Sequence, residues 1–540
     1  MKRLIKITAA LLPSVFFSIS VLAQDGINST VKVERDYEGE IAGTVKSHID
    51  APVDDSLLNF KLNFDYTTFY SPYKDLYEFS PIQTVGPSVA GRTVYPWLYA
   101  RVAAAYPWTP SADLYVSPRF GKRFTLGVRF NHDSYWGKTP MPVYSGNYQT
   151  SYRKIQGNRM TNSAGADMGY RWKKGEARLS AGYSAGMYAY NNESGSSRFE
   201  QADAVLNVRS TNADPSSFYY DFDLRYRYLS AFNSVSEHLA DAGLSLGAAV
   251  KDEHSVYLRL DGTFSNFGLW KVSPMYKWAK GRWRVKAGLV LSSVYGNGVS
   301  VGGERTIVYP DAAVGYEAVA NSLWLGLNVS GDNKLYARYD LLSINPWLSP
   351  EQGVYLTSTP VSVGLGLKGQ VRDRFSYSLK VDYSMVNNML SFGADRYMQK
   401  VYGGNSHTVG VDAAVRWKSR DFFAVVEAGY RYFSNQDAAL MMPPFDLKAV
   451  LEYNLRQRLF IRADCTYRTS VTGMGTDESG RSMSYKVPSF VDVGVRISYA
   501  VNMRMQVFVE GNNLANSKIQ YFLNYLEPGI NIGAGLCFKL

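Results

Sequence analysis

The chain has 540 residues, of which 14% are aromatic (41 of them tyrosine) and 19% are charged, with only two cysteines. Two cysteines exclude a disulfide scaffold and a zinc ribbon, and the aromatic content excludes a disordered chain. The chain has no long apolar run after residue 23, and its share of charged residues is high, so a helical membrane protein is excluded. The net charge of +11 is spread without long blocks of one sign, so no nucleic-acid partner is predicted. What remains is a large tyrosine-rich all-β chain, which is typical of a membrane β-barrel.

Residues 1–23 have the pattern of a secretory signal peptide. Lys2, Arg3 and Lys6 form a positively charged start, an apolar stretch follows, and a small residue, Ala23, precedes Gln24. We expect cleavage near Ala23 and no lipid attachment, because no cysteine follows the site. Residues 24–94 are expected to form a periplasmic N-terminal segment, in which residues 58–70 alternate and could add a strand. Residues 95–540 are expected to form the barrel.

The barrel region alternates between apolar and polar residues with a period of two, as strands do. The clearest segments are residues 176–187, 218–228, 375–383, 459–468 and 491–499. A soluble sandwich also alternates, but here the apolar faces are long enough to cross a bilayer. Tryptophans gather at strand ends, where the aromatic girdles of membrane barrels lie, namely Trp97, Trp108, Trp136, Trp172, Trp270, Trp278, Trp283 and Trp417.

Connections alternate between short and long. Short turns are expected at 121–122, 173–175, 251–253, 279–281, 371–373, 418–420, 455–457 and 501–502. Longer outer loops are expected at 138–158, 295–306, 331–357, 387–405, 435–444, 473–486 and 513–527. Residues 334–344 also alternate, but counting them as a further strand would break the even number of strands, so they are assigned to an outer loop. The count gives about 22 antiparallel strands, with short periplasmic turns and longer extracellular loops.

Charged residues of both signs occupy the polar faces of several strands. The candidates for lining the lumen are Asp221, Asp223, Arg225, Arg227, Arg462, Asp464, Arg468 and Arg496. Such a ladder can bind an anionic solute. The favoured interpretation is a set of mutually paired charges that stiffens a wide barrel.

No catalytic, metal or cofactor site is predicted. The five histidines are scattered, and His132 and Asp133 are neighbours on one strand, so they point to opposite faces. Cys465 and Cys537 are expected on opposite faces of the barrel wall and should not form a disulfide. The acidic pair Asp477 and Glu478 lacks the spacing of a calcium loop. The chain is therefore not expected to be an enzyme.

The last 35 residues or so resemble the end of a TonB-dependent receptor barrel. The matching positions are Glu510, Asn512, Asn513, Leu514, Asn516, Lys518, Tyr521, Pro528 and Gly529, followed by an alternating final strand that contains Phe538. This resemblance implies a Gram-negative outer-membrane barrel in contact with outer-membrane lipids. Members of that family carry a plug domain of well over one hundred residues before the barrel. Only residues 24–94 precede the barrel here, so the chain resembles a receptor that lacks the plug.

A wide barrel without a plug needs another closure. The candidates are residues 24–94 as a plug remnant, inward-folded loops such as 331–357 with Pro346, Trp347 and Pro350, lumen side chains, or a protein partner at the periplasmic or outer surface. The expected function is a transport conduit, or a partnered transport component, for an unknown solute. The alternatives are a structural or assembly scaffold and a general diffusion porin, and a barrel enzyme is least favoured.

Overall fold

The computed structural model describes residues 97–540 except for 119, 122, 146–147, 191–195, 212–217, 232–234, 252, 297–298, 302–304, 350, 396–397 and 477–480. The predicted signal peptide with its predicted cleavage site, and residues 24–94 with the possible strand at 58–70, lie outside the described residues. Among the described residues, no helix combines the length and the apolar character needed to cross a membrane.

The described chain forms a closed antiparallel β-barrel of 22 strands. The first strand, β1 (Leu98–Tyr106), pairs with β2 (Ser111–Val116) on one side and with the last strand, β29 (Asn531–Lys539), on the other. The short strand β12 (Val299–Val301) lies beside β15 in parallel and is not a member of the ring. The closed ring leaves the barrel without a free sheet edge along its middle. The predicted strand number and the all-β class are confirmed.

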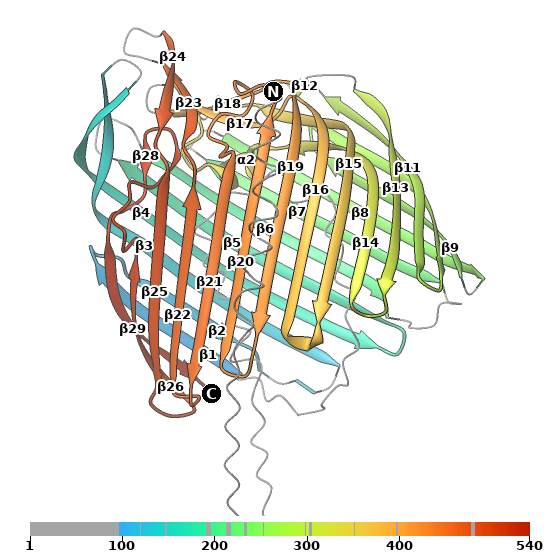
Figure 1. Ribbon diagram of the computed structural model, residues 1–540, viewed down its shortest axis with the longest axis horizontal. Helices are drawn as coiled ribbons and strands as arrows, with labels where there is room; N and C mark the ends of the chain where they lie inside the picture. The colour runs from blue at the N-terminus through green and yellow to red at the C-terminus, as the bar shows by residue number, and fades with distance from the viewer. Residues whose placement is uncertain are drawn as a thin grey trace, which may run out of the picture. The chain divides into compact units, whose positions relative to one another are not determined.

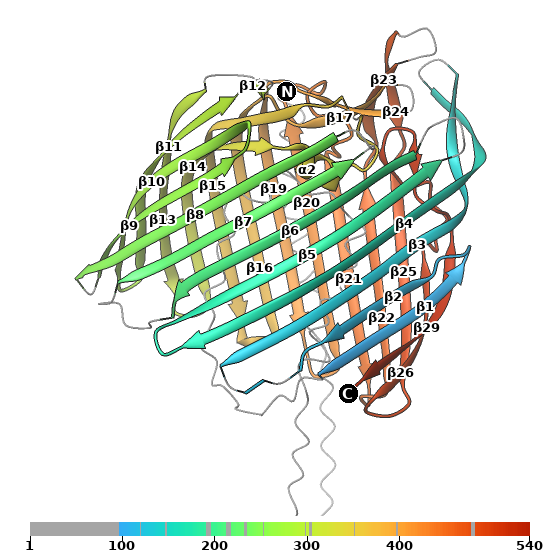
Figure 2. The ribbon, with the colours of Figure 1, turned by 180° about the vertical axis from the view of Figure 1, so that it is seen from behind.

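The strands of the first half are β3 (Phe124–Ser145), β4 (Tyr148–Trp172), β5 (Gly175–Tyr190), β6 (Ser196–Ser210), β7 (Tyr219–Ala231), β8 (Val235–Lys251), β9 (His254–Phe264), β10 (Phe267–Lys280) and β11 (Trp283–Gly296). Those of the second half are β13 (Thr306–Val319), β14 (Leu323–Tyr336), β15 (Val354–Val371), β16 (Phe375–Asn387), β19 (Ser406–Lys418), β20 (Phe422–Phe433), β21 (Phe445–Leu455), β22 (Leu459–Arg468), β25 (Phe490–Ala500) and β26 (Met505–Asn512). Figures 1 and 2 show the two halves as opposite walls, blue to green and yellow to red.

The two faces of each strand differ as the alternation predicts. On β7, Leu224 and Tyr226 are 42% and 46% exposed, whereas Arg227 and Leu229 on the other face are buried. The outer faces of the other strands repeat this pattern, with large apolar side chains exposed around the ring. A continuous apolar belt of this size is unfavourable in water and matches the hydrocarbon core of a bilayer.

The short connections fall where the sequence predicts them. The turn between β4 and β5 contains only Lys173 and Lys174, and a single 3-10 turn, η3 (Arg372–Arg374), joins β15 to β16. All such turns lie at one end of the barrel, here called the short-turn end. The long connections gather at the opposite end, here called the long-loop end (Figures 1 and 2).

One loop prediction is wrong and another holds in part. The described residues of 138–158 continue β3 and β4 as a paired ribbon, in which Pro140 lies opposite Lys154 and Pro142 opposite Tyr152. The prolines favour a loop in the sequence, but β3 has no partner on its other side at these positions, where strands tolerate proline. Residues 334–344 add no strand to the ring, as the parity of the strand count requires, and most of them lie in the connection to β15 as a helix, α2 (Arg338–Ile344). The first three, residues 334–336, belong to the end of β14 rather than to the loop.

The long loops carry secondary structure of their own. They contain α2, the hairpin of β17 (Ser391–Asp395) and β18 (Met398–Tyr402), the hairpin of β23 (Val471–Thr476) and β24 (Ser482–Val487), and the pair β27 (Gln520–Phe522) and β28 (Tyr525–Leu526). The two hairpins join into a four-stranded sheet through the pairing of β17 with β23. Residues 473–486, predicted as a loop, therefore lie largely in β23 and β24. The largest buried apolar cluster of the described residues lies here, at the long-loop end.

Candidate functional site

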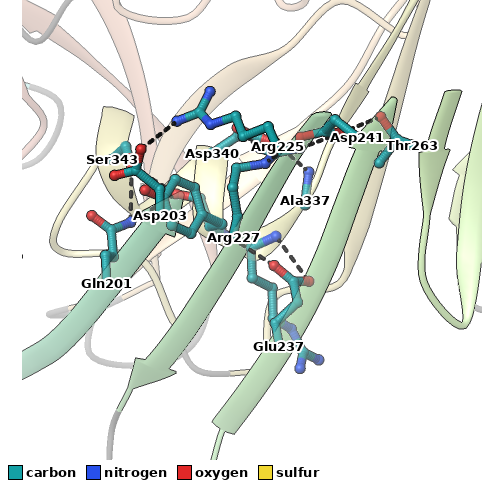
Figure 3. A network of polar contacts seen from close by, with 12 residues as sticks. Gln201, Asp203, Arg225, Arg227, Glu237, Asp241, Thr263, Ala337, Asp340 and Ser343 are labelled. Atoms are coloured by element: carbon teal, nitrogen blue, oxygen red, sulfur yellow. Dashed lines mark hydrogen bonds and ion pairs between the residues drawn. The ribbon is translucent and has the colours of Figure 1, made fainter. Parts of the chain in front are cut away.

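The most unusual connection is the α2 segment, residues 337–353, which joins β14 to β15. Instead of packing on its own strands alone, α2 contacts β6, β7 and β8, several strands away around the ring (Figure 3). Its apolar side chains Leu341, Leu342 and Ile344 are buried in one cluster with Leu229 and Ala231 of β7. The α2 segment therefore crosses the interior of the barrel at the long-loop end.

The start of α2 is capped by a side chain from the barrel wall. The N-cap residue, Ala337, has no side-chain acceptor for the first N–H groups of the helix, which need one. Glu237 of β8 supplies it, because its two carboxylate oxygens accept the N–H groups of Tyr339 at 2.9 Å and Arg338 at 3.3 Å. Asp340 accepts the N–H of Ala337 at 3.1 Å. The helix thus depends on the wall for its first turn.

A buried arginine joins the helix to two strands. Arg227 of β7 donates to Asp241 of β8 at 2.8 Å and to Asp340 of α2 at 2.6 Å. Its guanidinium carbon also lies 5.4 Å from the centre of the Tyr339 ring. Burial raises the pKa of the Asp340 carboxyl above its ordinary value, and the charge of Arg227 opposes that rise. The side chain of Arg227 is only 8% exposed and lies between the carboxylates of Asp241 and Asp340. Each charge thus supplies the counter-charge that its neighbour needs when water is excluded.

Gln201 of β6 holds the other side of the helix. Its side-chain amide donates to the carbonyl of Tyr339 at 3.1 Å and to the hydroxyl of Ser343 at 2.9 Å. Glu237, Arg227 and Gln201 therefore form a clamp on α2 from three neighbouring strands, drawn as sticks in Figure 3. We call these three residues the clamp.

Aromatic rings extend the contact beyond the helix. The Trp347 ring of the α2 segment stacks on Tyr525 of the last loop, with ring centres 4.2 Å apart and planes at 11°. Trp347 also meets Tyr188 of β5 edge-on at 5.3 Å, and Tyr188 stacks on Phe199 of β6. The α2 segment thus links the wall of β5 and β6 with a loop that precedes the last strand.

The remaining loops connect to the same structure. Gln399 of β18 donates to the carbonyl of Leu523 at 2.9 Å, and Thr476 of β23 donates to Asp395 of β17 at 2.9 Å. Asp395 also pairs with Lys400 and raises the pKa of that amine. We call the joined loops the lid, which comprises the described parts of residues 337–353, 388–405, 434–444, 469–489 and 513–530.

The predicted lumen residues of β7 all lie on the face of that strand that carries the clamp residue Arg227. Asp221 and Asp223 both accept from the amide of Asn207, at 2.8 and 2.5 Å. Arg225 lies 3.9 Å from Asp203, and Arg227 is the arginine of the clamp. The structure gives each of these residues a polar partner on its own or a neighbouring element.

The predicted residues on β22 and β25 form a second group. Arg462 donates to Glu452 at 2.8 Å, Asp464 lies opposite Gly494, and the guanidinium carbon of Arg468 lies 5.0 Å from the centre of the Tyr521 ring. Arg496 donates to Glu510 at 2.9 Å through Nε. A lumen-lining role for all eight residues remains a prediction.

The residues of the C-terminal motif lie at the seam between the last strands and β1. Glu510 binds Arg496 and also Arg101, at 3.4 Å. Asn513 shapes the loop after β26, because its side chain bonds to Ser517 and Pro528. The other motif positions pair or turn around this loop: Asn512 lies opposite Asn531, Leu514 donates its N–H to Val493, Pro528 and Gly529 precede β29, and Phe538 lies opposite Ala100.

The sequence did not single out Glu237, Gln201 or Asp340. The one sequence signal for Glu237 is its place in the alternating run Glu237, Leu239, Asp241, which puts it on the polar face of β8. Nothing local indicates that Glu237 and Gln201 meet a helix that lies 102 to 142 residues later in the chain. Both cysteines are free, and within the described residues no group of three histidine, cysteine or acidic side chains could hold a metal ion.

Comparisons with known proteins give the fold alone. No family model matches the sequence, and no curated protein matches it. Solved structures match across most of the chain at low identity. The copper transporter OprC is 13% identical with a TM-score of 0.60, covering 83% of this chain and 82% of its own. The FrpB iron transporter of Neisseria meningitidis is 11% identical with a TM-score of 0.60, covering 82% and 81%. The ferric enterobactin receptor of Pseudomonas aeruginosa is 9% identical with a TM-score of 0.59, covering 82% and 80%.

Proposed function

We propose that this protein is an outer-membrane transport conduit that uses its own loops as a gate. The barrel resembles those of a solved copper transporter and a solved ferric enterobactin receptor, and its apolar outer belt suits a bilayer. The short turns then face the periplasm and the lid faces the outside. The observation that carries the proposal is the clamp, which fixes a loop across the interior of the barrel.

In this proposal the lid takes over the closure that a plug provides in TonB-dependent receptors. The α2 segment of the lid is attached to the wall by the polar contacts of the clamp, by the edge-on contact of Trp347 with Tyr188 and by the burial of Leu341 and Leu342 beside Leu229, rather than by continuous strand pairing. Segments held by few contacts open at lower free energy than the body of a fold. The lid can therefore open while the ring of strands stays closed. A protein partner at the outer or periplasmic surface would act by shifting this equilibrium.

Single-channel conductance in a planar bilayer tests the proposal. The mature protein should be silent, and Arg227→Gln combined with Trp347→Ala should give steady openings. The matched control is Arg259→Gln with Trp417→Ala. Arg259 pairs with Asp261 on its own strand, and Trp417 is an outward-facing tryptophan 49% exposed, so neither touches α2. The control should stay silent.

A deletion of residues 24–94 separates the two possible closures. If the deletion alone opens the pore, these residues close the lumen and the lid proposal is wrong. If the native protein conducts steadily, the protein is a porin. Silence in every variant would favour a scaffold role.

A further inference from the structure

A group of positive side chains lines the inner face of the barrel near the short turns. It comprises Arg171 of β4, Arg178 of β5, Arg209 of β6, Lys277 of β10 and Arg284 of β11, and we call it the basic collar. Each member lies within a few residues of a short turn or of the end of its strand. The collar is thus at the opposite end of the barrel from the lid.

The strand register places these side chains on the inner face. Arg178 lies on the same face of β5 as Tyr188, and Arg209 on the same face of β6 as Gln201. Tyr188 and Gln201 touch the α2 segment. By the same alternation, Lys277 lies on the same face of β10 as Leu269, and Arg284 lies on the same face of β11 as Val294. Leu269 and Val294 belong to one buried cluster with Ala337, the N-cap residue of α2. Arg171 lies opposite Glu176, two residues from Arg178.

Three of the arginines share a single acid. Arg171, Arg178 and Arg209 approach the carboxylate of Glu176 at 3.3, 3.0 and 2.6 Å. The side chain of Glu176 is 5% exposed, whereas those of the three arginines are 68%, 56% and 44% exposed. One carboxylate neutralises one of three charges. Each guanidinium has five N–H donors, so most of the donors remain open to a ligand.

The other two cations rest on aromatic rings. The amine of Lys277 lies 4.1 Å from the centre of the Tyr257 ring, and the guanidinium carbon of Arg284 lies 5.1 Å from that of Trp324. A ring face orients a cation and leaves its net charge in place. Opposite Arg284 stands Gly315, where an added Cβ would find no atom closer than 3.8 Å. The surface beside Arg284 is therefore open to the lumen.

At the long-loop end of the lumen, the corresponding positive side chains are paired with acids. There Arg227 lies between two aspartates, Lys271 pairs with Asp332, and Arg159 pairs with Glu527. Each of these three cations thus has an acid of its own, whereas three arginines of the collar share Glu176. Charge of one sign on the wall of a low-dielectric opening concentrates counter-ions there.

We infer that the basic collar binds small anionic solutes that carry carboxylate or phosphate groups, and that it makes the opened conduit selective for anions. This inference rests on the proposed function and adds the class of solute. Guanidinium groups and amines are the usual protein partners of carboxylates and phosphates. The open arginine donors near Glu176 and the ring-supported cations on β10 and β11, which β7, β8 and β9 separate, provide two distinct sets of contacts for anionic groups.

The first experiment measures binding without any need for conduction. Isothermal titration calorimetry of the detergent-solubilised full chain with citrate, and separately with inorganic phosphate, should detect binding. Lys277→Gln with Arg284→Gln should weaken citrate binding roughly fivefold, since two charge-assisted contacts are lost. Arg171→Gln, at an exposed position, is a second variant that should weaken binding with little effect on folding. The matched control, Lys138→Gln with Lys154→Gln, removes two exposed charges from the β3–β4 ribbon at the long-loop end and should bind like the parent.

The second experiment uses the variant whose lid is released. In a potassium chloride gradient its reversal potential should show a preference for chloride of roughly threefold, which 1 M salt should reduce because the Debye length falls to about 3 Å. The collar substitutions should remove the preference. Absence of openings would reject the proposed function but leave the calorimetric result to decide on the collar. Equal citrate binding in collar and control variants, or no binding in the parent, would reject the collar.

Discussion

The carboxylate of Glu237 accepts the backbone N–H of Tyr339 at 2.9 Å across 102 positions of sequence. Through this contact a strand of the wall caps a helix of the lid, so the helix and its docking form together. A short helix of this kind is unstable by itself, because its seven residues cannot offset the cost of nucleation. When the lid leaves the wall, α2 is therefore expected to unfold as well.

Glu237→Gln should loosen α2 without affecting the barrel. The substitution removes the negative charge that interacts favourably with the positive N-terminal end of the helix. It also replaces one of the two oxygens that accept the N–H groups of Arg338 and Tyr339, and the helix should lose about 1 kcal/mol of stability. Hydrogen exchange of the amides in residues 338–344 should become several times faster. Glu427→Gln on β20 removes an acid that makes no contact with α2 and should leave these rates unchanged. Equal exchange in both variants would contradict the capping role.

Arg227 and Asp340 should be strongly coupled. Removing either partner leaves the other buried charge less compensated, and such losses cost about 3–5 kcal/mol in buried pairs. A double-mutant cycle with Arg227→Gln and Asp340→Asn, read by exchange protection of α2, should show that the double variant loses less than the sum of the singles. Strict additivity would mean that Asp241 alone holds Arg227.

Trp347→Ala should make the lid sensitive to protease. The substitution removes a ring that stacks on Tyr525 and meets Tyr188, and truncating a packed tryptophan costs about 3–5 kcal/mol. Limited proteolysis in detergent should then cut within residues 337–353 or 513–530. Trp417→Ala, on the outer face, should keep the parental cleavage pattern. Cleavage of the variant only in the short turns would contradict the prediction.

A reducible cross-link between the clamp and α2 should lock the lid. Gln201 touches Ser343 at 2.9 Å through its terminal amide nitrogen, which lies beyond the reach of a cysteine at position 201. Gln201→Cys and Ser343→Cys, with Cys465 and Cys537 replaced by serine, are therefore joined by a short bis-methanethiosulfonate reagent, which forms one disulfide with each thiol. Combined with Trp347→Ala, the cross-linked form should be silent in a bilayer and should conduct after reduction. Conduction that is independent of the redox state would show that the pore opens by another route.

Glu510→Gln should weaken the seam of the barrel. Glu510 binds Arg496 and also Arg101, whose side chain is 2% exposed, so the change leaves buried guanidinium groups without their full counter-charge. The unfolding temperature, followed by the heat-dependent shift in gel migration, should fall by several degrees. Glu452→Gln, which affects a more exposed pair with Arg462, should cause a smaller shift.

The barrel can be predicted from the sequence because its signal is local. The alternation of Leu224, Tyr226 and their neighbours, and turns such as Lys173–Lys174, are readable within a few residues. The β3–β4 ribbon escapes such a prediction because Pro140 and Pro142 normally argue against a strand. Only the strand register shows that β3 has no neighbouring strand on its β2 side at these two positions, so the prolines interrupt no pairing there.

The sequence indicates the lid only in outline. Residues 331–357, with Trp347, are among the segments that it offers for closing the lumen. The contacts that fix this segment, from Glu237, Arg227 and Gln201, join parts of the chain more than one hundred residues apart. No periodicity or motif carries such information, because each of these residues also suits an ordinary polar face of a barrel strand.

The pairing of β1 with β29 has a consequence for biogenesis. Tyr99 lies opposite Lys539, so the ring of hydrogen bonds can close only after β29 has been made. Until then the edges of β1 and β29 both expose unpaired backbone groups, which neither bilayer nor dilute solution tolerates without risk of aggregation. Closure of the ring is therefore expected to be a late step that requires β29. Loss of a few C-terminal residues should block assembly more severely than loss of any outer loop.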